Sequence, residues 1–127
     1  LYSRYADDLV FSSNAEEMPA YRLVKAVSKI VASEGFRINK HKTNIMRHPH
    51  RQIVTGLVVN KDVRISRNDL RKFRAFLHHC ETKGLESVSK DIGKDAIAVA
   101  RGYLSYINMI SPELAKTMSS KHLWISK

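Results

Sequence analysis

The chain has 127 residues, enough for one domain with a small buried core, and its 43% hydrophobic and 27% charged content is ordinary for a globular protein. No apolar run approaches the roughly 20 residues that a membrane span needs, so no membrane partner is expected. The single cysteine, Cys80, excludes an internal disulfide and favours a cytoplasmic protein, whereas the net charge of +10 favours a polyanionic partner such as nucleic acid.

The first predicted element is a β-hairpin. Residues 1–5 and 9–13 are rich in aromatic and β-branched residues, and Ala6-Asp7-Asp8 between them is typical of a turn. At a hairpin tip both carboxylates can lie near the same end, and hard oxygen ligands of this kind suit Mg²⁺ or Mn²⁺. Asp7 and Asp8 are therefore candidate metal ligands and catalytic residues for phosphoryl displacement. A turn without chemistry is the alternative, because Asp is also a common turn residue.

A helix is predicted next, from about Met18 to Glu34. Glu16 and Glu17 suit the positive end of its dipole, and Gly35 suits its C-terminal end. Its apolar side chains recur at helical spacing, at Leu23, Val24, Val27, Ile30 and Val31.

Short strands are predicted after this helix. Residues 36–39 and 44–46 flank a polar turn, and a longer strand signal covers 52–60. Gly56 interrupts that signal, which favours a β-bulge or a close backbone approach. The chain then turns, and 63–65 is expected to return as a further strand.

The remainder is predicted to be helical. Ser66 is a predicted N-cap with Asp69 three residues later, and Gly84 is the predicted end of the helix that follows. A second helix is predicted for about 94–109, and Ser111-Pro112-Glu113 is a typical helix start. The predicted fold class is therefore α+β.

The basic residues are unevenly placed. Between Arg37 and Lys83 there are twelve basic residues and three acidic ones, a density above what solubility needs. We expect sequence-independent phosphate contacts from the outward cations of the helix after Ser66, with a solvated basic face as the alternative. The predicted nucleic-acid-binding residues are Arg67, Arg71, Lys72 and Arg74, with Arg101 and Lys116 as further candidates.

Tyr5-Ala6-Asp7-Asp8, between two strands and followed by a helix, resembles the catalytic Y-x-D-D hairpin of reverse transcriptases. The resemblance implies that residues 1–65 are the C-terminal part of a polymerase palm, with a β-hairpin, a helix and a small antiparallel sheet. Residues 66–127 would be a small helical thumb. The resemblance also makes Asp7 a principal metal ligand and Asp8 a support of the metal site, with Tyr5 and Ala6 close to the primer end.

Further motifs extend the resemblance. "GFRINKHKTNIM" resembles the next palm motif, in which Lys42 would meet the triphosphate or protonate pyrophosphate, although a solvated loop lysine is the alternative. "RQIVTGLVVNKDVRIS" resembles the primer-grip hairpin, and "RGYLSYINMISPELAKTM" resembles the thumb, whose basic face tracks the template–product duplex. Val54-Thr55-Gly56 resembles the V-T-G region of bacterial retron enzymes, where it is linked to recognition of the enzyme's own structured RNA. The resemblance places these residues next to the nucleotide or primer, and a plain strand with one glycine is the alternative.

The implied function is synthesis of cDNA from an RNA template by two-metal nucleotidyl transfer. The implied partners are the RNA template, the RNA–DNA duplex, deoxynucleoside triphosphates and a cognate structured non-coding RNA, in a bacterial cytoplasm. The family's site needs a third aspartate from an earlier strand, so we expect this chain to be a fragment that is inactive alone. A group II intron-like or other defence-associated reverse transcriptase is one alternative, and a non-catalytic basic RNA-binding module is the other.

Overall fold

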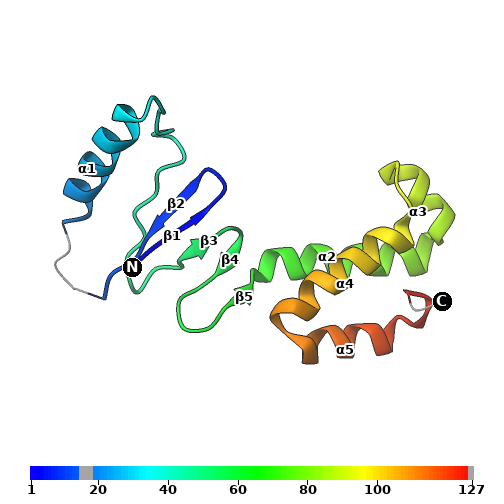
Figure 1. The fold of residues 1–127 in the computed structure, drawn as a ribbon. Helices are drawn as coiled ribbons and strands as arrows, with labels where there is room; N and C mark the ends of the chain where they lie inside the picture. The colour runs from blue at the N-terminus through cyan, green and yellow to red at the C-terminus, as the bar shows by residue number, and fades with distance from the viewer. Residues whose placement is uncertain (15–18, 126–127) are drawn as a thin grey trace. The chain divides into compact units, whose positions relative to one another are not determined.

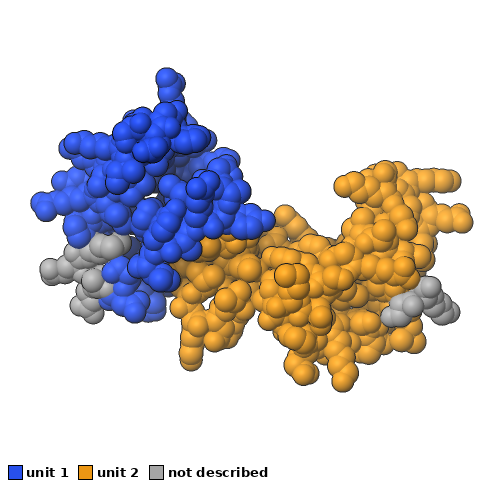
Figure 2. All heavy atoms as spheres, viewed as in Figure 1, with its two compact units in different colours: residues 1–50 blue, residues 51–127 orange. Residues whose placement is uncertain are grey.

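The computed structural model describes residues 1–14 and 19–125, and the contacts within it divide the chain into two compact units, residues 1–50 and 51–127 (Figures 1 and 2). Both units are described separately below as unit 1 and unit 2. The chain combines helices with small antiparallel sheets, which confirms the predicted α+β class. None of the described helices has the length and apolar content to cross a membrane.

Unit 1 begins with the predicted hairpin. Strands β1 (Tyr2–Tyr5) and β2 (Asp8–Phe11) pair antiparallel, with Tyr2 opposite Phe11 and Tyr5 opposite Asp8. The rings of Tyr2 and Phe11 lie 5.0 Å apart between centroids, the kind of cross-strand aromatic pair that stabilises a two-stranded sheet.

Helix α1 (Ala20–Ser33) follows. The backbone N–H of Gly35 donates to Ala32 and that of Phe36 donates to Val31, at 3.1 and 3.0 Å, while Gly35 has a φ of 80°. This arrangement is a Schellman motif, and it confirms Gly35 as the helix end. The predicted start at Met18 and the acidic pair Glu16 and Glu17 lie outside the described residues.

The predicted strands at 36–39 and 44–46 are wrong, because no strand lies among residues 36–50. A local turn takes their place. The backbone N–H groups of Lys42 and Thr43 both donate to the Asn39 carbonyl at 3.1 Å, and the Asn39 side chain accepts from the His41 N–H at 3.0 Å. Asn side chains favour such turns, and in this segment local hydrogen bonds take the place of a strand ladder.

Unit 2 starts with a three-stranded antiparallel sheet in the order β3-β4-β5, formed by β3 (Ile53–Val54), β4 (Leu57–Val58) and β5 (Arg64–Ile65). The bulge predicted at Gly56 is wrong. Thr55 and Gly56 instead form the two-residue turn of a hairpin, because Val54 pairs with Leu57. The predicted return strand is confirmed as β5.

The rest of unit 2 is helical. Helix α2 (Arg67–Lys83) has Ser66 as its N-cap, whose side chain accepts from the Asp69 N–H at 3.1 Å, as predicted. The later helices are α3 (Leu85–Ile92), α4 (Ala96–Ile110), α5 (Pro112–Lys121) and a 3₁₀ turn at Leu123–Ile125. The sequence did not predict the short helix α3. Pro112 begins α5 as predicted, although the Ser111 side chain makes no capping hydrogen bond.

The buried core of unit 2 forms where α4 packs against its neighbours, with Ala100 and Ile107 on its inner face. Leu77 of α2 and Ile107 are completely buried, and the ring of Phe73 stacks on that of Tyr103 at 4.4 Å between centroids. Strand β5 also packs against α4, so the contacts group the small sheet with the helices. The division into a palm portion (1–65) and a thumb (66–127) stays a prediction.

Candidate functional site

The tip of the β1–β2 hairpin is a strained two-residue turn of Ala6 and Asp7. Ala6 has a φ of 51°, and Ala6 alone among the turn's two central residues is at positive φ, as in a type II′ turn. A non-glycine residue held at such a φ costs about 1–3 kcal/mol, and glycine would avoid that cost. The Arg4 Nε donates to the Ala6 carbonyl at 2.7 Å, which holds the turn in this conformation. The sequence motif predicted the turn but gave no sign of its strain.

Asp7 and Asp8 are both exposed at this tip, Asp7 in the turn and Asp8 as the first residue of β2. Neither carboxylate makes a hydrogen bond or an ion pair with any other residue in the described part of the chain. Asp8 lies on the strand face that also carries Tyr5, whereas Tyr2 and Phe11 lie on the other face. The structure therefore brings the two predicted carboxylates together at one end of the hairpin.

The donor set of this tip fits a hard divalent ion. Two exposed carboxylates without a protein partner offer the anionic oxygen atoms that Mg²⁺ and Mn²⁺ prefer. No group of three or more His, Cys, Asp or Glu side chains that could hold a metal ion is found in residues 1–14 and 19–125. The described residues thus supply a carboxylate pair, while the three-carboxylate site that the resemblance implies is not assembled from them.

Lys42 lies in the same unit, in the turn held by Asn39. Its side chain is exposed, and its backbone N–H donates to the Asn39 carbonyl. The neighbouring Thr43 hydroxyl donates to the same carbonyl at 3.0 Å. The turn therefore presents the lysine to solvent on a fixed backbone, which is compatible with an anionic ligand.

The Val54-Thr55-Gly56 turn is the second strained turn. Thr55 and Gly56 have φ values of 47° and 86°, so both central residues are at positive φ, as in a type I′ turn. Glycine adopts this region freely, but for a β-branched threonine it is a genuine outlier. Thr55 and Gly56 are exposed and Val54 is half-buried. A strained, exposed residue of this kind is typical of functional turns.

The predicted cations of α2 fall into two groups. Arg67, Arg71 and Arg74 share one flank because they stand at i, i+4 and i+7, while Lys72 turns to the opposite flank with His79 and Lys83. His78, eleven residues after Arg67, lies on the same flank as the three arginines. The sequence analysis did not name His78 as a nucleic-acid-binding residue, although its helical spacing from Arg67 indicates this position. Arg71 donates to the Asn68 side chain at 3.0 Å.

The two remaining predicted cations differ in their surroundings. The Arg101 Nε donates to the Ile125 carbonyl at 2.8 Å, so this arginine holds the end of the described chain onto α4. Lys116 is exposed on α5. The structure thus gives Arg101 a packing role that the sequence did not predict.

Comparison with known proteins defines the class. No protein-family model matches the chain, and no solved structure matches it. Clear relatives nevertheless exist among characterised proteins, and they are reverse transcriptases. The chain is therefore related to a segment of reverse transcriptases, as the Tyr5-Ala6-Asp7-Asp8 motif indicated.

More narrowly, the three relatives compared are retron enzymes. The chain is 36% identical to the retron Mx65 reverse transcriptase of Myxococcus xanthus over 121 residues, which cover 94% of the chain and 26% of that protein. It is 35% identical to the retron Mx162 reverse transcriptase of Myxococcus xanthus, covering 87% of the chain and 25% of the relative. It is 36% identical to the retron Ec86 reverse transcriptase of Escherichia coli, covering 84% of the chain and 31% of that protein. The chain spans about a quarter to a third of the length of these relatives.

Proposed function

We propose that this chain is the part of a retron-type RNA-directed DNA polymerase that carries the catalytic hairpin. The observation that carries the proposal is the exposed carboxylate pair, Asp7 and Asp8, which has no protein partner in the described part of the chain. An acidic tip of this kind on a protein of net charge +10 is explained by a cation that lies between the tip and nucleic-acid phosphates.

Asp7 and Asp8 would hold Mg²⁺, or Mn²⁺, together with a further carboxylate from elsewhere in the protein. When bound, such ions stabilise the attacking and leaving oxygen atoms of an in-line displacement. In the reaction the primer 3′-oxygen would attack the α-phosphate of a deoxynucleoside triphosphate, the hydroxyl proton would pass to solvent, and the bond to pyrophosphate would break so that pyrophosphate leaves. Lys42 would bind the triphosphate or protonate the pyrophosphate, and Tyr5 and Ala6 would lie beside the primer end.

The other predicted residues would bind nucleic acid around this centre. Val54-Thr55-Gly56 would contact a cognate structured non-coding RNA, for which an exposed turn with a strained threonine is a suitable contact. Residues 1–65 would act as the C-terminal palm portion and residues 66–127 as the thumb, in the bacterial cytoplasm. The thumb contacts with the RNA template–DNA duplex would come from Arg67, Arg71, Arg74, Lys72, Lys116 and the outward part of Arg101.

The test is the substitution Asp7→Asn in the full-length protein. We expect DNA synthesis on an RNA template to fall at least about 100-fold, the scale seen when one group that stabilises transition-state charge is removed. RNA affinity should stay within about twofold, because Asp7 is exposed and its substitution should leave the fold intact. Asp91→Asn is the matched control, since Asp91 is another exposed aspartate and has no assigned catalytic or nucleic-acid-binding role.

Primer extension and filter binding of the same preparations give both readouts. Retained synthesis by Asp7→Asn would contradict the catalytic role. Full RNA binding by a wild-type protein that makes no DNA would favour the non-catalytic RNA-binding module instead.

A further inference from the structure

Helix α1 carries a row of cations that the proposed function does not use. Arg22, Lys25 and Lys29 stand at i, i+3 and i+7, which places them on one face of the helix, centred opposite Val27. All three side chains are exposed. We call this set the α1 basic face.

Within residues 1–14 and 19–125, these cations have no acidic partner. None of the three forms an ion pair or a side-chain hydrogen bond with the residues that the structure describes. Surface cations of helices are often paired with an acid one turn away, but α1 contains no acidic residue between Ala20 and Ser33. The face is therefore positive along its whole length, which is about 10 Å from Arg22 to Lys29 at the helical rise.

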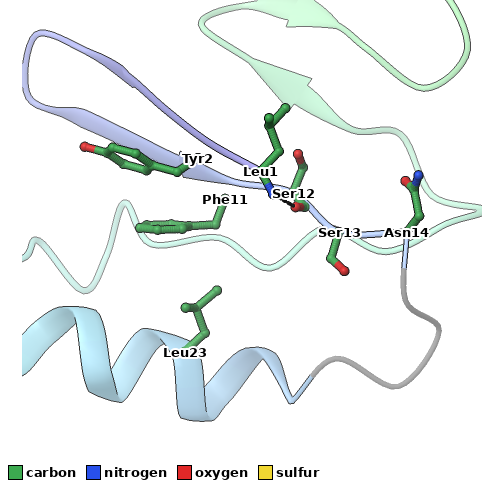
Figure 3. Close-up of a pocket in the computed structure, with 7 residues that line it drawn as sticks. All are labelled: Leu1, Tyr2, Phe11, Ser12, Ser13, Asn14 and Leu23. Carbon is green, nitrogen blue, oxygen red and sulfur yellow. Dashed lines mark hydrogen bonds between the residues drawn. The ribbon is translucent and has the colours of Figure 1, made fainter.

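The α1 basic face points away from the catalytic tip. Leu23, on the apolar side of α1, lines a hollow together with Tyr2 and Phe11, and its side chain points towards the Phe11 ring (Figure 3). Asp8 lies on the hairpin face opposite to Phe11. Since the hairpin, α1 and the hollow all belong to unit 1, the basic face and Asp8 lie on opposite sides of that unit.

We propose that the α1 basic face binds the phosphate backbone of structured RNA, as a second nucleic-acid surface separate from the catalytic side. This inference rests on the proposed function for the presence of an RNA partner. Three cations spread over about 10 Å of helix can contact several phosphates of one RNA strand. Insertion into a membrane would need the apolar side of α1, which is turned towards the hairpin hollow. Contacts of this kind fix the position of the RNA without reading its sequence.

The test is the triple substitution Arg22→Gln/Lys25→Gln/Lys29→Gln in the full-length protein. Gln is a good helix former, so α1 should persist, and circular dichroism checks this. The control is Lys90→Gln/Lys94→Gln/Lys121→Gln, which removes the same charge from exposed positions of unit 2. The probe is a hairpin RNA with a stem of about 16 base pairs, the length that a double-stranded RNA-binding domain spans.

Two measurements decide the matter. The slope of log affinity against log salt for the hairpin RNA should become shallower by about 2–3 in the α1 triple variant, because three phosphate contacts are lost, and should stay nearly unchanged in the control. Primer extension on a short RNA template–DNA primer, which occupies only the catalytic side, should be unchanged in both variants.

An unchanged salt slope in the α1 variant, or the same change in the control, would overturn the inference. Loss of binding to anionic phosphatidylserine vesicles with full RNA binding would also overturn it, in favour of a membrane surface. These outcomes are separate from failure of the proposed function, which would appear as absence of primer extension by the wild-type protein.

Discussion

The two units of the chain differ in what they bury. All the buried hydrophobic side chains of the described residues lie in unit 2, from Ile65 to Ile125, and unit 1 has none. In unit 1 large apolar side chains remain open to solvent, with Tyr5, Phe36 and Tyr21 about 70% exposed (72%, 70% and 69%). The unit that carries the carboxylate pair is thus not the unit that holds a core.

The physical reason lies in the size of the elements. A two-stranded hairpin is at best marginally stable alone. The apolar stripe of α1 adds little burial, because its side chains Leu23, Val24, Val27 and Val31 are only half-buried. Burial of apolar surface is the main favourable term in folding, so unit 1 contributes little to stability by itself. Helices α2, α4 and α5, by contrast, bury a shared core. The comparison teaches that the carboxylate pair proposed for catalysis and the buried core that stabilises the chain belong to different units.

The largest expected effect is that of Leu77→Ala in α2. Leu77 is completely buried, so its truncation should cost about 2.7–5 kcal/mol of the free energy of unfolding. For a unit of this size that lowers the melting temperature by well over about 10 °C, as followed by circular dichroism. Val27→Ala in α1 is the control for unit 1 and should leave the melting temperature nearly unchanged, because Val27 is only half-buried. A larger effect from Val27→Ala than from Leu77→Ala would reverse the comparison.

An effect of middle size is expected from Ser66→Ala, which removes the cap of α2. The Ser66 side chain accepts from the Asp69 N–H and its hydroxyl donates to the Asp69 carboxylate at 2.6 Å. Loss of such a cap costs about 0.5–2 kcal/mol, measurable by urea unfolding. Ser111→Ala is a matched control at the start of α5, where the serine side chain makes no cap, and its cost should stay below about 0.5 kcal/mol. Equal costs at the two sites would show that the Ser66 cap adds nothing.

The smallest effect is a dependence of unit 2 on pH. The Glu81 carboxylate accepts from the His122 ring at 2.6 Å and from the Trp124 N–H at 3.4 Å, which ties α2 to the last described turn. The hydrogen bond from His122 is the main reason that the pKa of Glu81 lies below its ordinary value, and the charge of His122 and the hydrogen bond from Trp124 lower it further. A lowered pKa stabilises the fold at a pH above the unfolded value, and this contribution is lost as the pH falls through the folded value.

Thermal unfolding measured between about pH 6 and pH 3 checks this dependence. The wild-type melting temperature should fall across the acid end of the range, and Glu81→Gln should make the fall shallower. Other carboxylates also titrate there, so the difference between the two proteins is the relevant quantity. Parallel curves would show that the Glu81–His122 contact contributes nothing to stability.

The sequence by itself determined the features that depend on neighbouring residues. The hairpin, its carboxylate tip, the Ser66 cap and the Gly35 helix end follow from turn and capping preferences, and the motif around Asp7 and Asp8 indicated the class of protein. These features need no distant contact, so local chemistry suffices to specify them.

Only the tertiary structure decided the rest. The Arg101 side chain donates to the Ile125 carbonyl, 24 residues away in the sequence, a contact that no local pattern indicates. The concentration of the whole described core in unit 2 likewise depends on which helices pack together. A pattern of apolar residues predicts which side chains favour burial, but only the packing of distant segments determines which of them are buried.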